Sequence, residues 1–473
     1  MTRAPDLSRA AEAKKLLAIA APLMAAYVAE FSMFMTTKLV VGSLGYKHLA
    51  AVGLGGSLTF EAMVVVMGLL SITGVLAAQA EGAGRKQEAG NAARQGLIVA
   101  ALVSLPMAAL VWNLDTVMRW TGQDEEVAAL AGPYLRAIAF VVLPTFLFTV
   151  LRDFTAALAR TGPIMAITLV AVLVNWGLAE GLVHGRWGLP AMGVAGAGLA
   201  KVIVSWGMLA ALALYIWRKP ALRGYGLFRA RLRFDRLVIG AIIRLGLPVA
   251  GLVAVEAGLF SMVGILSGVV GPEMLAAHQV LMGWIGIPFV IALGMAEASM
   301  VRVAHGIGRG DPAGARQAGL TGLAIGVAIL TVMVAAPLLL AEEITRFFIP
   351  AADPGFPAVS ALVARLMMVA ALFQIFDGAQ AIMSRALRGL KDAYFPLWIG
   401  AFGYWVLGVG GGWILAFPLG WGGVGLWSGL AAGLIVTACL LTLRFLAVSR
   451  RALVARHMNT SAKSGDHGRI GSP

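Results

Sequence analysis

Long apolar runs separated by short polar segments dominate the chain. A helix that crosses the hydrocarbon core of a bilayer needs about 20 largely apolar residues. Twelve runs reach this length, so the pattern predicts twelve membrane-spanning helices. In the first half they cover 15–42, 49–79, 93–113, 126–151, 161–184 and 192–217, and in the second half 239–271, 274–301, 317–341, 357–388, 395–417 and 421–446.

The composition supports this interpretation and excludes other classes of protein. Hydrophobic residues make up 60% of the 473 residues and charged residues only 13%, whereas soluble domains carry about 25% charged residues. The excess apolar surface must face lipid. A soluble enzyme, a nucleic-acid binder and a disordered chain are therefore excluded, and we expect an all-α, multi-pass membrane protein.

The basic residues that give the net charge of +14 gather in alternate loops. Loops after even-numbered spans hold 18 Lys/Arg and 6 Asp/Glu, and loops after odd-numbered spans hold 5 and 9. Basic loops stay in the cytoplasm, so we expect the even loops and both termini there. The most basic loop, 218–238, lies at the middle of the chain and is predicted to link two halves.

The two halves repeat each other. Pro22 and Pro248, Glu30 and Glu256, and the segments Leu49-Ala50-Ala51 and Leu275-Ala276-Ala277 all lie 226 residues apart. Each half has six spans, so both halves insert in the same direction and form parallel repeats. We therefore expect two six-helix lobes. The predicted organisation is an N-terminus over 1–14, an N-lobe over 15–217, the linker over 218–238, a C-lobe over 239–446 and a disordered cytoplasmic tail over 447–473.

Three acidic residues within the spans are candidates for chemistry. A charge at the bilayer centre costs at least ~2.5–3.5 kcal/mol on insertion scales, so each needs an explanation. Glu30 and Glu256 occupy repeat-related positions, and Asp377 lies on the tenth span. Because desolvation raises the pKa of a carboxyl group, such acids are suited to proton exchange or cation binding. The alternative is a protonated carboxyl that forms an interhelical hydrogen bond.

Other polar residues in the spans carry weaker signals. We consider Glu61, Asn175 and His278 as cavity residues, although packing roles are as plausible for Glu61 and more so for His278. Glu297 is likewise either a cavity residue or a polar packing residue. Lys38 and Lys201 are expected to extend toward the interface. Arg136, Arg244 and Arg365 are expected to do the same or to pair with acids. No metal-site spacing and no Walker pattern occurs, so we expect no cofactor, no resident metal and no ATP hydrolysis.

The order of several short motifs resembles the multidrug and toxic compound extrusion (MATE) family from about residue 15 to 446. The motifs are the two related openings, with Gly42-Ser43-Leu44-Gly45 in the first and Ala277-His278-Gln279 in the second, then Gly306-Ile307-Gly308-Arg309-Gly310-Asp311, Phe376-Asp377-Gly378-Ala379-Gln380 and Leu387-Arg388-Gly389. The resemblance implies a V of two lobes in the bacterial inner membrane. It also implies a monomeric antiporter, not an enzyme, that exports small organic cations against inward H⁺ or Na⁺.

The resemblance also implies roles for individual residues, and at some positions this sequence differs from the residues that are common in the family. Glu256 and Asp377 match the coupling acids of one bacterial branch, where Na⁺ is a further ligand to consider. Phe373 replaces an aromatic hydroxyl of that branch, which favours H⁺. Thr37 replaces an acidic residue common on the first span, and we propose that Glu30 substitutes for it in part. Gln374 and Gln380, which flank Asp377, complete the cavity candidates together with Phe373 and Thr37.

Two alternatives remain open from the sequence. A flippase for lipid-linked precursors of the same superfamily would need a large basic cavity, for which Arg136, Lys201, Arg244 and Arg365 are the candidates. The central acids argue against it. The second alternative is a membrane scaffold without transport activity, but such a protein would not need buried acidic residues.

Overall fold

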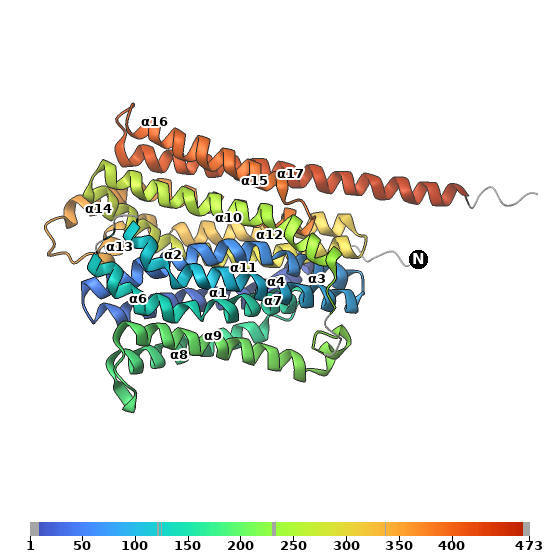
Figure 1. Ribbon diagram of the computed structural model, residues 1–473. Helices are drawn as coiled ribbons and strands as arrows, with labels where there is room; N and C mark the ends of the chain where they lie inside the picture. Colours follow the sequence, from blue (N-terminus) through green and yellow to red (C-terminus); the bar gives the residue numbers. More distant parts are fainter. Residues whose placement is uncertain (1–8, 121–122, 124, 229–232, 336, 467–473) are drawn as a thin grey trace, which may run out of the picture.

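The protein is a bundle of long helices that run roughly parallel to one axis (Figure 1). A computed structural model describes residues 9–120, 123, 125–228, 233–335 and 337–466. The first half contains α1 (Arg9–Gly42), α2 (Tyr46–Leu70), α3 (Ile72–Gly82), α4 (Lys86–Trp112), α5 (Leu114–Trp120), α6 (Glu125–Ala139), α7 (Val142–Ala157), α8 (Gly162–His184) and α9 (Gly193–Arg218). The second half contains α10 (Arg236–Val270), α11 (Pro272–Gly308), α12 (Pro312–Ala335), α13 (Ala341–Phe348), α14 (Phe356–Gly389), α15 (Tyr394–Ala401), the π-helical η4 (Phe402–Gly411), α16 (Gly412–Ala416) and α17 (Gly422–Asp466). Short 3-10 turns are η1 (Arg186–Gly188), η2 (Pro220–Tyr225) and η3 (Pro337–Leu339).

Within the described residues, eleven helical segments are each long and apolar enough to cross a membrane. The twelfth span is the pair α6 and α7, which is bent by 46°. Pro144, in the first turn of α7, explains the break, because a proline ring clashes with the carbonyl four residues earlier, here that of Phe140. Each of the twelve predicted spans corresponds to one of these segments.

The repeat is visible in the local backbone. Gly45 precedes α2 and Gly271 precedes α11, and both have positive φ, 119° and 156°. The short helices α5 and α13 each follow the third span of their half. At the start of α10 the carboxylate of Asp235 accepts hydrogen bonds from the backbone N–H groups of Leu237 and Val238, a regular helix cap. The second half therefore begins a new set of helices in the order of the first.

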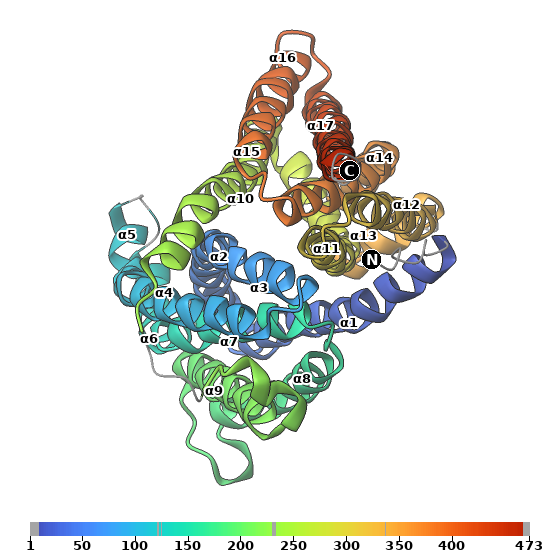
Figure 2. The same cartoon turned by 90° about the vertical axis from the view of Figure 1, so that its right-hand side faces the viewer.

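The two halves form separate lobes that meet along a central seam (Figure 2). The N-terminal lobe (9–218) meets the C-terminal lobe (236–466) where α1 and α3 pack against α11 and where α2 packs against α10. α8 and α9 lie on the outside of one lobe, and α15 to α17 lie on the outside of the other. This confirms the predicted two-lobe, all-α membrane fold.

At one end of the bundle α1 begins and α3, α11 and α14 end; we call it the terminal end (Figure 1). The lobes approach each other closely there. There a Cβ added to Gly308 would lie 2.0 Å from the carbonyl oxygen of Gln79, and one added to Gly82 would lie 2.4 Å from that of His305. Nε2 of Gln79 also donates to the carbonyl of Gly389 at 2.9 Å. These close backbone contacts and this hydrogen bond hold the two lobes in contact at the terminal end.

The C-terminal tail differs from expectation. α17 continues as a helix to Asp466, beyond the predicted end of the last span at 446. The expectation of disorder is therefore wrong for 447–466, while 467–473 lie outside the described residues. Directly beyond residue 446, Arg450, Arg451, Ala452 and Leu453 are all strong helix formers and favour the start of this continuation.

Candidate functional site

One amide bridges two acidic side chains in the C-terminal lobe. Nε2 of Gln380 donates to Oε1 of Glu256 at 2.9 Å and to Oδ1 of Asp377 at 3.3 Å. The hydroxyl of Tyr404 donates to Oε1 of Gln380 at 2.8 Å, which fixes the direction in which the amide points. Glu256 comes from α10, Asp377 and Gln380 from α14, and Tyr404 from η4. Three elements thus assemble this cluster, which we call the acid pair site.

One oxygen of the acid pair site is unsatisfied. Asp377 is fully buried, and its Oδ2 has no hydrogen-bond partner among the described residues. A buried carboxylate oxygen without a donor is costly. A proton on Oδ2, or a small cation beside it, would remove that cost. Glu256 is only half-buried, so one member of the pair retains contact with the surroundings of the lobe.

Two other predicted residues, Gln374 and Phe373, precede Asp377 on α14, and His278 lies beyond them on α11. Gln374 is buried one turn before Asp377, and neither of its amide atoms finds a partner in the part of the chain that is described. Phe373 is fully buried, with its ring centroid 6.1 Å from that of Phe260 and 5.7 Å from that of Trp427. His278 packs against the same tryptophan, with ring centroids 5.7 Å apart. Phe373 therefore lies in a packed ring cluster and not at a cavity wall.

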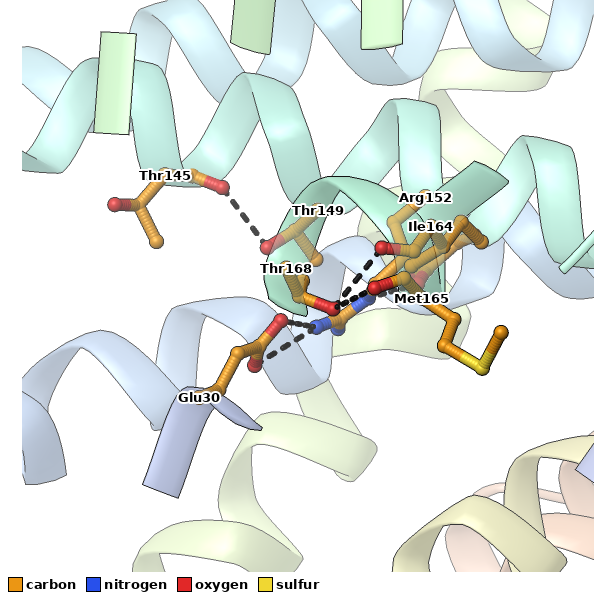
Figure 3. Close-up of polar contacts among 8 residues, drawn as sticks. Glu30, Thr145, Thr149, Arg152, Ile164, Met165 and Thr168 are labelled. Carbon is orange, nitrogen blue, oxygen red and sulfur yellow. Dashed lines mark hydrogen bonds and ion pairs between the residues drawn. The ribbon is translucent and has the colours of Figure 1, made fainter. Parts of the chain in front are cut away.

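Glu30, the counterpart of Glu256 in the repeat, is part of an ion pair (Figure 3). Nη1 of Arg152 lies 3.4 Å from Oε1 and 3.5 Å from Oε2 of Glu30. Nε of Arg152 lies 3.4 Å from Oδ1 of Asp153, and its guanidinium carbon lies 5.1 Å from the ring centroid of Tyr27. The two lobes therefore differ: an arginine from α7 faces the acid of α1, whereas a glutamine from α14 faces the acid of α10.

This ion pair borders a cavity of about 180 Å³ inside the N-terminal lobe. Its polar lining includes Glu30, Arg152, Asn175 and Lys201, which come from α1, α7, α8 and α9. Nδ2 of Asn175 lies 3.4 Å from Oγ1 of Thr37, whose hydroxyl also donates to the carbonyl of Met33 at 2.9 Å. Thr37 is buried behind the cavity wall, so of this pair Asn175 is the one that faces the cavity.

A second hollow lies between the lobes, away from the terminal end. A groove of about 480 Å³ is bordered by Glu61 of α2, by Phe260 and Gly264 of α10, and by Leu275 and His278 of α11. Because its walls come from both lobes, this groove changes shape if the lobes move. Glu61 and His278 are thus brought together at the seam, apart from the acid pair site.

The basic residues considered for a flippase cavity do not converge. Arg136 is exposed and lies 3.8 Å from Asp115, and Arg244 and Arg365 are also exposed. Lys201 alone of the four borders the N-terminal cavity. The expectation that Lys201 extends toward the interface is wrong, because its ammonium group lies 5.7 Å from the ring centroid of Phe34, which borders the same cavity.

Two residues of these sites were not singled out from the sequence. Arg152 was counted as a loop residue because the fourth span was predicted to end at 151, but α7 continues to Ala157 and buries it. Tyr404 carried no signal among the many aromatic residues of the eleventh span. Oε2 of Glu297 on α11 lies 3.6 Å from Nε of Arg385, so the carboxylate of Glu297 has a basic neighbour.

Comparison with known proteins gives a consistent result. The family model described as MatE matches residues 22–179 and 248–414. A probable multidrug resistance protein NorM of Bradyrhizobium diazoefficiens is 38% identical over 447 residues, which are 94% of this chain and 96% of that protein. The NorM protein of Mesorhizobium japonicum is 36% identical over 452 residues, 95% of this chain and 97% of its own length.

Solved structures agree on the fold. The eukaryotic MATE transporter AtDTX14 superposes with a TM-score of 0.84 at 24% identity, covering 94% of this chain and 98% of that one. An outward-facing multidrug resistance MATE family transporter has a TM-score of 0.84 at 19% identity and covers 95% of this chain and 99% of its own.

Proposed function

The chain belongs to the MatE family, and on that premise we propose that it is a secondary active antiporter that exports organic compounds, mostly lipophilic cations, in exchange for inward H⁺ or Na⁺. Family membership makes it a membrane transporter, and the bacterial relatives are named for multidrug resistance. The observation that carries the exchange mechanism is the buried, unsatisfied Oδ2 of Asp377 in the acid pair site.

The acid pair site supplies the coupling. Two carboxyl groups share one amide donor, so the cluster has more acceptors than donors and gains from a proton or a monovalent cation. Uptake of that ion from outside removes negative charge from the C-terminal lobe and weakens the hold on a cationic substrate. Release of the ion inside restores the charge. A ligand shifts a conformational equilibrium only through its different affinity for the two states, and the acid pair supplies that difference.

Access alternates between the two ends of the bundle. We place the terminal end in the cytoplasm, in agreement with the basic loops found there, and the protein in the bacterial inner membrane with both termini inside. In the conformation described here the lobes approach each other closely at the terminal end, and the groove bordered by Glu61 and His278 lies away from it. This arrangement corresponds to a state that is closed toward the cytoplasm.

The alternative of a flippase for lipid-linked precursors is less well supported. Arg136, Arg244 and Arg365 are exposed, so these residues do not form the basic cavity that a pyrophosphate group would need. The acid pair site would also repel such a group.

Replacement of either acid by its amide tests the proposal. Efflux of a fluorescent lipophilic cation from membrane vesicles, driven by an imposed pH gradient, should be lost or reduced at least tenfold in Glu256→Gln and Asp377→Asn. The matched control is Glu273→Gln, which makes the same change on the exposed first turn of α11 and should retain efflux. Unchanged efflux in both acid-site variants would refute the coupling role.

A further inference from the structure

An ion pair in the C-terminal lobe lies between the acid pair site and the seam. Oε2 of Glu297 on α11 lies 3.6 Å from Nε of Arg385 on α14, which is longer than a hydrogen bond. Glu297 is buried, and its other oxygen, Oε1, has no hydrogen-bond partner among the described residues. Arg385 is only partly buried. A loose pair of this kind leaves Arg385 free to interact with a second acid.

Arg385 shares one side of α14 with the acid pair site. It follows Asp377 by eight residues, which at about 3.6 residues per turn places the two residues roughly 80° apart around the helix axis. Side chains on a helix tilt toward its N-terminus, so the long side chain of Arg385 extends back toward Gln380. Among the charged groups that act on Glu256, Arg385 has the largest effect. Because a nearby positive charge favours the ionised form of a carboxyl group, Arg385 opposes the uptake of a proton or cation by the acid pair site.

Glu297 lies where the two lobes touch. One turn earlier on α11, a Cβ added to Gly294 would lie 2.7 Å from the backbone nitrogen of Met24 on α1. Glu297 also acts electrostatically on Arg152 and Asp153 of α7. The surroundings of its carboxylate therefore include the N-terminal lobe, and they change if the lobes separate.

Ionisable groups from several elements surround this pair. They are Arg388 from α14, Arg152 and Asp153 from α7, Tyr27 from α1, Glu256 from α10 and Tyr404 from η4. Arg388 is buried, and its Nε has no hydrogen-bond partner in the part of the chain that is described. Over the described ranges, Arg385 alone of the three arginines lies within ion-pair distance of Glu297, so it is the cation that Glu297 attracts most directly.

We propose that Arg385 is a positioning residue of the acid pair site whose charge is shared between Glu256 and Glu297, so that contact between the lobes raises the affinity of the site for the coupling ion. This inference rests on the proposed exchange function and names a regulation of the same site. While the lobes touch, the buried carboxylate of Glu297 attracts Arg385 strongly, because a Coulomb interaction grows as the dielectric constant falls. When the lobes separate at the terminal end, water reaches Glu297 and weakens this attraction. Arg385 then acts more strongly on Glu256, and the ion is released on the cytoplasmic side.

Protonation of the acid pair site tests the inference without depending on transport. The readout is the infrared absorption of protonated carboxyl groups, recorded against pH for the protein in lipid nanodiscs without Na⁺ and assigned by its loss in Asp377→Asn. Arg385→Gln removes the cation and should raise the pH of half-protonation by about one unit, the effect of one unit charge at roughly 10 Å and an effective dielectric constant of about 20. Glu297→Gln removes the competing acid, leaves Arg385 to act on Glu256 and should lower that pH.

Opposite shifts in the two variants distinguish this role from a structural one. A general loosening of the packing would move the pH of half-protonation in the same direction in both, and that result would overturn the inference. Arg385→Lys keeps the charge and should shift the pH less than Arg385→Gln does. The control is Arg346→Gln, which removes an exposed arginine of α13 and should leave the pH unchanged. If Arg385→Gln does not fold, Glu297→Gln decides alone: a lower pH supports the inference, and an unchanged or higher pH overturns it.

The outcome is separable from that of the proposed function. If Asp377→Asn abolishes gradient-driven efflux but Arg385→Gln and Glu297→Gln titrate like the wild type, the inference fails and the proposed function stands. If the two variants shift the titration in opposite directions but no gradient drives efflux of any compound, the proposed function fails, while the sharing of Arg385 between the two acids remains.

Discussion

Arg302 and Glu12 form a buried, two-pronged ion pair across the seam between the lobes. Nε of Arg302 donates to Oε1 of Glu12 at 2.8 Å, and Nη2 donates to Oε2 at 2.6 Å. Glu12 lies in the first turn of α1 and Arg302 near the end of α11, so the pair joins the two lobes at the terminal end. Fork-to-fork geometry of this kind gives the strongest hydrogen bonds between side chains.

Removing one partner of this ion pair should lower the stability of the fold, and removing both should lower it by less than the sum of the two single losses. Glu12→Ala or Arg302→Ala leaves one buried charge without a partner, a loss of about 3–5 kcal/mol. The double variant leaves none. Thermal unfolding in a detergent of fixed concentration should therefore show the double variant to be less destabilised than the sum of the two single variants. Strict additivity would mean that the pair contributes no coupling.

The close contact of Gly308 with Gln79 should limit substitution at the terminal end. Gly308→Ala places a methyl group 2.0 Å from a carbonyl oxygen of the other lobe, so the helices must separate, at a cost of about 1–3 kcal/mol. Spin labels on α3 and α11 should report a longer distance between the lobes there. Gly207→Ala is the control, because its added Cβ meets nothing within 4 Å. An unchanged distance in Gly308→Ala would contradict the contact.

Tyr404 should affect the ion affinity of the acid pair site without being essential for transport. Its hydroxyl holds the oxygen of Gln380, so that the amide nitrogen faces both acids. Tyr404→Phe removes one neutral hydrogen bond, with a net contribution of about 0.5–1.5 kcal/mol. We expect the ion concentration that gives half-maximal transport to shift by roughly two- to tenfold, with the maximal rate retained. Complete loss of transport would mean that the hydroxyl has a larger role than orientation.

Arg152 should be the residue that keeps Glu30 in an ion pair, whereas its counterpart Glu256 faces a glutamine. Arg152→Gln recreates in the N-terminal lobe the acid–glutamine arrangement of the C-terminal lobe, but it leaves Glu30 without a cation. We expect the variant to be destabilised by about 3–5 kcal/mol and the added Glu30→Gln to restore much of that loss. Thermal unfolding of the two single variants and the double variant measures this. A double variant no more stable than Arg152→Gln would contradict the pairing.

The sequence was sufficient to predict the spans, the repeat and the two-lobe fold. The hydrophobic runs matched the helices because a bilayer imposes a minimum length on every span. Glu256 and Asp377 were detected because charges are rare inside such runs. Their meeting at Gln380 required the structure. The roles proposed for these residues stay predictions.

What could not be predicted was which way the side chains face. In a soluble helix a polar face distinguishes outside from inside, but here the lipid-facing and cavity-facing sides are both apolar. Lys201 and Arg152 were therefore assigned to the membrane surface, although they face the interior of the N-terminal lobe. Arg302 was counted as a loop cation for a related reason: apolarity declines before a helix ends, and α11 continues to Gly308.

The central claim is that the acid pair site couples export to an inward ion gradient. The most direct measurement is substrate movement in proteoliposomes under separately imposed H⁺ and Na⁺ gradients, for the wild type, for Asp377→Asn and for the control Glu273→Gln. The account predicts that at least one gradient drives transport in the wild type and the control, and that Asp377→Asn responds to neither gradient while still binding substrate. Gradient-driven transport by Asp377→Asn at the wild-type rate would contradict it.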